Sequence, residues 1–207
     1  MSIYNLLFPA RCPFCSKLIE NGKPSCDGCY TLTEIPPHTQ RLRNGCVCLS
    51  AFPHKGVYRK AVLNYKFHNN KQYYRQFAIL IKKTIENGYS NKDFDIFTAV
   101  PMHKQRLKEK GFNQVALYAK CTAKLLHKPY EELLVQTVLT QAQHTLNREE
   151  RKSNIKDIYS CIDKADIAGK NILIFDDIVT TGSTLLECTN TLLAGGAESV
   201  CCVTINY

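Results

Sequence analysis

Two adjacent acids, Asp176 and Asp177, are the residues of this chain whose types and position most clearly predict chemistry. They follow residues 172–175, a continuous apolar run that favours a strand buried on both faces of a parallel sheet. The acids therefore lie at the carboxyl end of that strand, where open α/β sheets bind ligands. Carboxylates at such a place can accept hydrogen bonds from sugar hydroxyls, directly or through Mg²⁺.

The turn after these acids has the composition of a phosphate-binding loop. It contains the small residues Thr180, Thr181, Gly182, Ser183 and Thr184, which open a predicted amphipathic helix. Backbone N–H groups around a glycine can converge on one anion, and a helix N-terminus adds partial positive charge. Acids and turn together predict a site for a ribose 5-phosphate. The alternative is a purely structural strand-to-helix turn in which Asp and Thr serve as caps.

Residues 172–184 resemble the phosphoribosyl pyrophosphate (PRPP) binding motif of type I phosphoribosyltransferases: an apolar strand, two acids, two apolar residues and Thr-Thr-Gly-Ser-Thr. The chain has neither Gly-x-x-x-x-Gly-Lys-Ser/Thr nor Gly-x-Gly-x-x-Gly, so the two commonest other nucleotide motifs are excluded. The resemblance implies that the acids are the catalytic residues and bind ribose hydroxyls or Mg²⁺. It implies that PRPP is bound by Ile178, Val179, Thr180, Thr181, Gly182, Ser183 and Thr184.

A second candidate site is an array of four cysteines, Cys12, Cys15, Cys26 and Cys29, in two Cys-x₂-Cys pairs ten residues apart. Each pair aims two thiolates at one point, and four thiolates suit the tetrahedral preference of Zn²⁺. We predict a structural zinc ion that supplies the folding free energy of a segment too short to build a core. A disulfide pairing is the alternative and would require an oxidising compartment. A redox role for one Cys-x₂-Cys pair would leave the presence of the second pair unexplained.

Cys46 and Cys48 form a further pair with one residue between them. This spacing places both thiols on one face of a strand predicted over 46–52. They are interpreted as a buried pair, with supplementary zinc ligation as the alternative. The sequence does not decide whether they join the metal site.

Composition limits the architecture to one ordinary core and a small appendage, since the chain has 207 residues of which 44% are apolar. We expect a zinc knuckle with a linker over 1–44, in which residues 31–44 form the linker, and a second domain over 45–207. No run of 18 apolar residues occurs, and the short apolar stretch 3–10 lacks the flanks of a signal peptide. The expectation is a cytoplasmic protein without membrane insertion, whose eleven cysteines are metal ligands and core residues.

The positive charge is concentrated in residues 55–128, which we call the basic belt. It holds sixteen Lys or Arg against four Asp or Glu, whereas the whole chain has a net charge of +9. Such a belt favours polyanions, either a pyrophosphate or a nucleic-acid backbone. The alternative is a lysine-rich surface that serves solubility.

Strand and helix patterns alternate along the rest of the chain. Helices are predicted over 57–67, over 71–87, from 111 onward and after the PRPP motif; strands over 95–100, 133–139 and 199–205; and loops over 101–110 and 140–157. Alternating units of this kind predict an α/β fold with a parallel sheet and right-handed crossovers.

The order of these parts resembles the ComF/GntX family of phosphoribosyltransferase-like proteins. It runs from the four cysteines through Tyr-Lys-Phe, Val-Pro-x₉-Gly-Phe-Asn-Gln and Gln-x₂-Leu-x-Arg-x₂-Arg-x₂-Asn to the PRPP motif. The resemblance implies a type I phosphoribosyltransferase fold, a parallel sheet flanked by helices, with a small N-terminal four-cysteine zinc finger. It implies a covering loop over 140–154. It also implies a pyrophosphate loop formed by Pro101, Met102, His103 and Lys104.

Further basic residues are candidates for nucleic-acid or anion contacts: Lys66, Arg106, Lys108 and Lys110. The chain departs from the family pattern in two ways. Lys110 stands where arginine is expected, which removes bidentate phosphate binding there. A second Cys-x-x-Cys pair of longer relatives is missing.

The resemblance implies binding of PRPP and Mg²⁺ and a role in natural competence, with single-stranded DNA and other DNA-uptake proteins as partners. Single-strand binders combine basic grooves with stacking aromatics, and the belt has Tyr58, Tyr65, Phe67, Tyr73 and Tyr74. The alternative is a phosphoribosyltransferase of nucleotide metabolism or salvage that transfers ribose 5-phosphate to a nitrogen acceptor. The sequence provides no recognisable acceptor site. It leaves open whether catalysis occurs and which oligomeric state the protein has.

Overall fold

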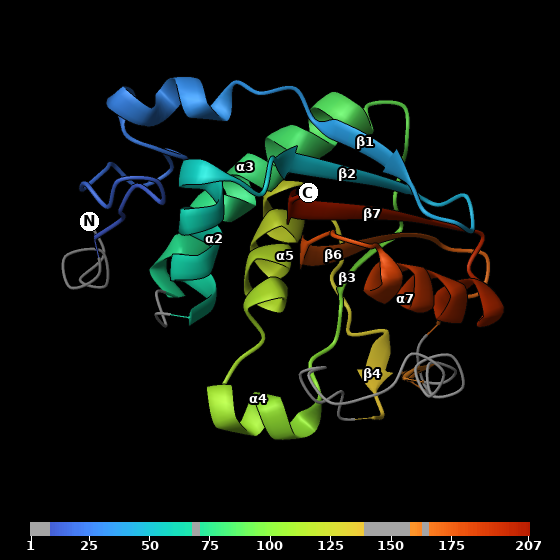
Figure 1. Cartoon of the computed structure of the whole chain (residues 1–207). Coiled ribbons are helices and arrows are strands. Elements are labelled where there is room, and N and C mark those ends of the chain that lie inside the picture. Colours follow the sequence, from blue (N-terminus) through green and yellow to red (C-terminus); the bar gives the residue numbers. More distant parts are fainter. Residues whose placement is uncertain (1–8, 68–70, 139–157, 163–165) are drawn as a thin grey trace.

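A five-stranded sheet forms the centre of the protein in a computed structural model that describes residues 9–67, 71–138, 158–162 and 166–207 (Figure 1). The strand order is β1-β2-β7-β6-β3. Pairing is parallel except between β1 and β2. The strands span His38–Arg41 (β1), Val47–Phe52 (β2), Ile96–Ala99 (β3), Asn171–Ile178 (β6) and Ser199–Asn206 (β7).

Strand β6 lies between β3 and β7 and carries the predicted buried run. Leu173 and Phe175 are fully buried in the core on one face of the sheet, and Ile172 and Ile174 are fully buried in the core on the other face. Successive side chains of a strand point to opposite faces, so a strand covered on both sides reads as continuously apolar. The predicted strand is therefore confirmed, and it extends through the two acids.

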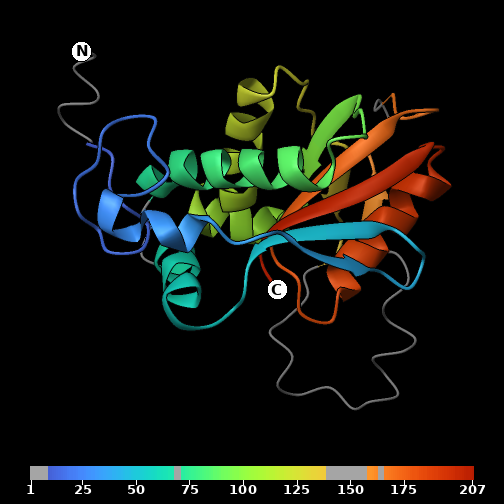
Figure 2. The same cartoon turned by 90° about the horizontal axis from the view of Figure 1, so that it is seen from above.

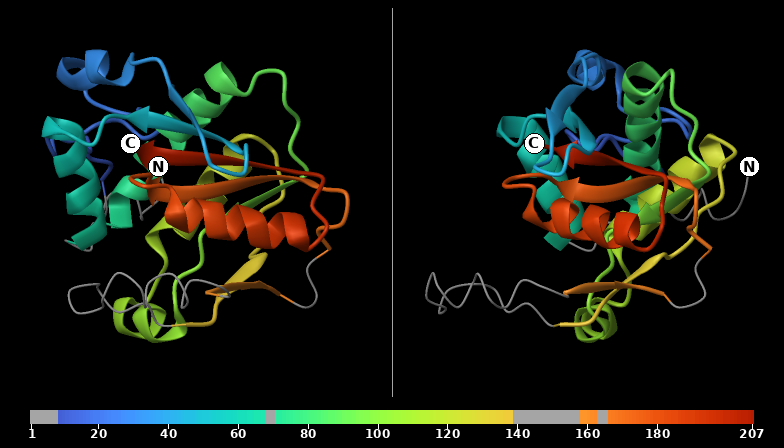
Figure 3. Two further views of the ribbon diagram at one scale, coloured as in Figure 1. Left: turned by 45° about the vertical axis from the view of Figure 1, so that its right-hand side comes forward. Right: turned by 90° about the vertical axis from the view of Figure 1, so that its right-hand side faces the viewer.

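Helices cover both faces of the sheet (Figures 2 and 3). Helices α2 (Gly56–Phe67), α3 (Tyr74–Gly88) and α5 (Gln114–Leu125) pack on one face, and a short 3₁₀ turn, η2 (Lys71–Tyr73), precedes α3. Helix α7 (Ser183–Ala194) packs on the opposite face. The predicted α/β architecture, a mostly parallel sheet flanked by helices, is confirmed.

The segment predicted as a basic loop over 101–110 is mostly a helix, α4 (Lys104–Lys110). The side chain of His103 caps it, since Nδ1 accepts a hydrogen bond from the N–H of Gln105 at 3.3 Å. Gly111 ends it in a left-handed conformation with φ of 79°. No residue of α4 is buried. The helix therefore leaves no apolar periodicity in the sequence, which is why the loop prediction was wrong.

The strand predicted over 133–139 forms, but it lies outside the main sheet. Strand β4 (Leu134–Gln136) pairs antiparallel with β5 (Tyr159–Cys161) to make a separate hairpin. The edge of β3 is instead met by Tyr130, which forms a parallel bridge with Phe97. The loop predicted over 140–157 lies outside the described residues.

The segment 31–44 is only partly a linker. It begins within the 3₁₀ helix η1 (Asp27–Thr33) and contains β1, which pairs with β2 at the edge of the main sheet. The four-cysteine segment also contacts the core, because the ring of Phe14 meets those of Phe52 and Tyr58 edge-on at centroid distances of 6.0 and 5.8 Å. The division near residue 44 stays a prediction.

Within the described residues, no helix combines the length and the apolar character needed to cross a membrane.

Candidate functional site

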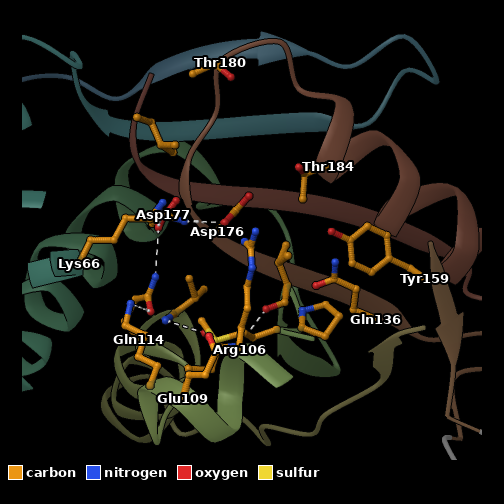
Figure 4. A pocket seen from close by; sticks show the side chains of 17 residues that line it. Lys66, Arg106, Glu109, Gln114, Gln136, Tyr159, Asp176, Asp177, Thr180 and Thr184 are labelled. Carbon is orange, nitrogen blue, oxygen red and sulfur yellow. Dashed lines mark hydrogen bonds and ion pairs between the residues drawn. The ribbon is translucent and has the colours of Figure 1, made fainter. Parts of the chain in front are cut away.

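A cavity of about 650 Å³ opens at the carboxyl ends of β3 and β6, where the sequence predicts a ligand site (Figure 4). Both acids line it, together with side chains from several other parts of the fold. Those from the segment after β3 and from α4 and α5 are Pro101, Met102, Arg106, Glu109, Lys110 and Gln114. Those from α2, the hairpin, the turn after β6 and the first turn of α7 are Lys66, Gln136, Tyr159, Thr180 and Thr184.

The two acids reach the cavity from different faces of β6, because neighbouring strand residues alternate. Asp177 is only 6% exposed and points toward α2 and α5. Its Oδ2 accepts the Lys66 ammonium at 2.8 Å and the amide of Gln114 at 3.4 Å. A buried carboxylate requires such partners. Asp177 therefore lies between a cation and a neutral hydrogen-bond donor.

Asp176 is half-buried and lies toward Thr184 (Figure 4). Burial, reinforced by the neighbouring charge of Asp177, raises the pKa of Asp176 to about 8. Its Oδ1 accepts the backbone N–H of Asp177 at 2.8 Å. The hydroxyl of Tyr118 donates to the backbone carbonyl of Asp176 at 2.6 Å and so fixes the strand end. The two acids therefore differ: Asp176 favours its protonated form, whereas Asp177 forms an ion pair with Lys66.

Gln114 connects Asp177 to a second lysine. Lys110 Nζ donates to Oε1 of Gln114 at 2.6 Å, while the backbone carbonyl of Gln114 accepts the hydroxyl of Tyr65 at 2.7 Å. Burial, with a contribution from the nearby charge of Lys66, lowers the pKa of Lys110. Two lysines from distant parts of the sequence therefore flank one buried acid.

The predicted phosphate turn closes a small cavity of about 30 Å³ next to Asp176. Thr181 and Ser183 share a hydrogen bond between their hydroxyls at 2.9 Å, and Gly182 directly precedes α7 with φ of 74°. A Cβ at Gly182 would lie 2.9 Å from the side chain of Leu42. Conformation and space both require glycine here. Val179 is buried, and its N–H donates to the carbonyl of Asn206.

The candidate basic residues separate into two groups. Arg106, Lys110 and Lys66 line the main cavity. Lys104 lines a second cavity of about 410 Å³ on the other side of the segment after β3, and Lys108 is exposed and borders neither. Pro101 and Met102 border both cavities. His103 caps α4 with its side chain.

The lining residues that were not singled out from the sequence include Gln114, Gln136 and Tyr159. Gln114 belongs to Gly-Phe-Asn-Gln, so its place in a motif could have marked it. Gln136 and Tyr159 come from β4 and β5, and only the pairing of these strands brings them to the cavity. No local pattern in the sequence predicts that β4 and β5 pair.

The four predicted metal-binding thiols do come together. The sulfur atoms of Cys12, Cys15, Cys26 and Cys29 lie within 4.8 Å of one another, close enough to hold a metal ion. Burial and the thiols of Cys26 and Cys15 raise the pKa of Cys29, as expected where a cation must compensate clustered thiolates. Cys46 and Cys48 are instead buried in the core beneath α7. This confirms their interpretation as a buried pair.

Much of the basic belt is already engaged. Ion pairs join Lys82 to Glu86, Lys83 to Glu34, Lys120 to Glu132 and Lys128 to Asp93. Tyr65 and Tyr73 are buried, and Tyr58 and Tyr74 pack against the same core. The structure describes the side chains of these four among the five aromatics proposed for stacking, and all four belong to the core. An exposed aromatic, Tyr30, lies instead on η1 of the four-cysteine segment.

Comparison with known proteins agrees with this geometry. Residues 119–207 match the phosphoribosyl transferase domain. The DNA utilization protein YhgH of Escherichia coli K12 is 35% identical over 107 residues, 51% of this chain and 46% of that protein. The competence protein ComFC of Bacillus subtilis is 26% identical over 160 residues, 75% of this chain and 62% of that protein.

The chain is a ComF-family phosphoribosyltransferase-like protein. Competence protein F of Haemophilus influenzae is also similar to this ComF-family chain, with 26% identity over 67% of the chain and 63% of that protein. The matched segment is about half the length of the YhgH relative from E. coli K12. Among solved structures, adenine phosphoribosyltransferase from Saccharomyces cerevisiae has a TM-score of 0.43 at 11% identity over 86% of the chain and 89% of that protein.

Proposed function

We propose that the main cavity binds PRPP together with Mg²⁺. One observation carries this proposal: two carboxyl groups and the hydroxyl-rich start of a helix line the same cavity. The other walls of that cavity carry Lys66, Arg106 and Lys110. The turn at 180–184 would receive the 5-phosphate. The acids would receive the ribose hydroxyls, and the backbone of the segment from Pro101 to Lys104 with the side chains of Lys66, Arg106 and Lys110 would face the pyrophosphate.

The residues present fit a divalent cation. Asp176 and Asp177 supply oxygen ligands of the kind that Mg²⁺ prefers, and their carboxyl groups lie on adjacent residues at the cavity wall. Such an ion would neutralise charge on a bound pyrophosphate. The chain's own residues would orient the ribose and keep the anionic ligand between Asp176, the turn and α4.

We further propose that PRPP binding serves natural competence and DNA uptake, including the handling of single-stranded DNA. Relatives named as competence and DNA utilization proteins support this role. Exposed Lys104 and Lys108 on α4 and exposed Tyr30 on η1 offer backbone and stacking contacts outside the main cavity. The alternative is transfer of ribose 5-phosphate to a nitrogen acceptor, and the polar side chains of Gln136 and Tyr159 at the cavity favour it.

One experiment separates the two roles. Purified protein is incubated with PRPP and Mg²⁺, with and without nucleobases and single-stranded DNA, while pyrophosphate release and strand binding are followed together. The competence role predicts PRPP binding and strand binding without base-dependent pyrophosphate release. Base-dependent release would favour the transferase, and failure to bind PRPP would contradict both.

For the four-cysteine cluster we propose structural zinc, and we expect about one zinc ion per chain. Replacing Cys26 and Cys29 together with serine should reduce bound zinc at least about tenfold, because two neutral hydroxyls cannot replace two thiolates. Metal analysis after purification without chelator measures this. A Cys121→Ser variant, altered at a half-buried thiol outside the cluster, should keep its zinc. Full retention by the double variant would contradict the assignment.

A further inference from the structure

The ion pair between Lys66 and Asp177 lies where the proposed function places a metal ion. The Lys66 ammonium is 2.8 Å from Oδ2 of Asp177, whose side chain is 8% exposed, whereas the Lys66 side chain is 34% exposed. The acid is therefore fixed and buried while the lysine reaches it from the cavity side. The two residues are 111 positions apart in the sequence, so the fold itself creates this contact.

The backbone of α2 is held independently of this ion pair. Tyr65 is anchored by its hydrogen bond to the Gln114 carbonyl, and Tyr58 stacks on Phe52 with a centroid distance of 4.9 Å. The last turn of α2 therefore stays in place if the ammonium leaves. A lysine has a flexible four-carbon stem, so its charge can move by several ångströms without movement of the helix.

We propose that Lys66 is the resident counter-ion of Asp177, which a divalent cation displaces, and that the released ammonium then contacts the anionic part of the ligand. This inference rests on the proposed function of the acidic pair. A divalent cation bound to Asp177 would lie within a few ångströms of the Lys66 charge, where like charges repel strongly. Gln114 can remain in place because its amide is neutral.

Lys110 makes the exchange more favourable. It also flanks Asp177 through Gln114, so a cation at the acid would add to two positive charges already present. Movement of Lys66 toward the incoming anion lowers that repulsion and adds a contact to the ligand. Cation and anion should therefore promote each other's binding, because coupling between two ligands is reciprocal.

The first test is Mn²⁺ binding to the full zinc-loaded chain without PRPP, measured by the electron paramagnetic resonance of free Mn²⁺. Lys66→Met removes the competitor while keeping an apolar stem, so Mn²⁺ affinity should rise about tenfold. Lys66→Arg keeps the competing charge and should bind no better than the wild type. Lys60→Met, which removes an exposed charge on the same helix, serves as the matched control and should leave affinity unchanged.

The second test is PRPP binding by calorimetry at saturating Mn²⁺, where Lys66→Met should bind PRPP about tenfold more weakly. Opposite changes in the two affinities support the exchange, whereas damage to the site would weaken both. The inference would be overturned if the Lys66→Met variant unfolds like the wild type and its Mn²⁺ affinity is unchanged or lower. So would a gain in Mn²⁺ affinity that persists after Asp177→Asn. If the wild type binds Mn²⁺ but not PRPP, the proposed function fails, and the rise in Mn²⁺ affinity still decides whether Lys66 competes.

Discussion

Replacing Asp176 and Asp177 together with asparagine is expected to weaken PRPP binding in Mg²⁺ by at least about 100-fold. Asparagine keeps the size of each side chain and an oxygen that can still accept from Gln114. It removes the negative charge of Asp177 and the charge that Asp176 gains when a bound cation displaces its proton, and both a cation and a ribose hydroxyl would use these charges. Hydrogen bonds to charged groups contribute about 1.5 to 3 kcal/mol each, and two such losses exceed the 2.7 kcal/mol of a 100-fold change.

Calorimetry with and without Mg²⁺ measures this effect, and thermal unfolding shows that the variant is folded. The matched control is Asp166→Asn with Glu198→Gln. Both acids are exposed, and neither lies at the carboxyl end of a strand: Asp166 precedes the buried Ile167, and Glu198 precedes β7. It should bind PRPP like the wild type. Unchanged affinity in the Asp176 and Asp177 variant would show that the sequence motif is a structural turn.

Charge reversal on α4 should separate strand binding from PRPP binding. Lys104 and Lys108 lie one helical turn apart and away from the main cavity, whereas Arg106 lines it. Lys104→Glu with Lys108→Glu is therefore expected to weaken single-stranded DNA binding about 100-fold at low salt. It should also reduce the dependence of log K on log salt by about 1.4, since each neutralised phosphate contributes about 0.7. Arg106→Glu should instead weaken PRPP binding.

Fluorescence anisotropy of a labelled strand across a salt series measures both quantities. Arg41→Glu with Arg43→Glu, an equal charge change at exposed sites on β1 and the turn after it, is the control and should change strand binding far less. Loss of both ligands in either α4 variant would mean that the strand and PRPP share one entrance. Absence of strand binding in zinc-loaded wild-type protein would contradict direct DNA binding and favour the transferase.

The sequence predicts those parts of the fold that depend on neighbouring residues. The run 172–175, the acids after it and the glycine of the turn are predictable because burial on both faces, strand polarity and a positive φ each leave a local pattern. The four cysteines are predictable because their spacing alone sets the geometry of a metal cluster.

The remainder depends on contacts between distant residues. Helix α4 buries nothing, so it lacks the periodicity by which helices are recognised, and its cap is a histidine. The β4–β5 hairpin pairs residues about 25 positions apart across a segment without a turn signal. The Lys66–Asp177 pair cannot be derived from either of its two segments, since it requires that α2 end beside the tip of β6.

The aromatic contact of Phe14 has a consequence for how this chain denatures. Phe14, Phe52 and Tyr58 form one cluster with members from the four-cysteine segment, from β2 and from α2. Melting of the metal-binding segment alone would expose apolar rings of the main body to water, at about 25 cal/mol for each Å² uncovered. The two parts are therefore thermodynamically coupled. Calorimetric heating of the zinc-loaded chain should give one cooperative transition rather than an early melting of the N-terminal segment.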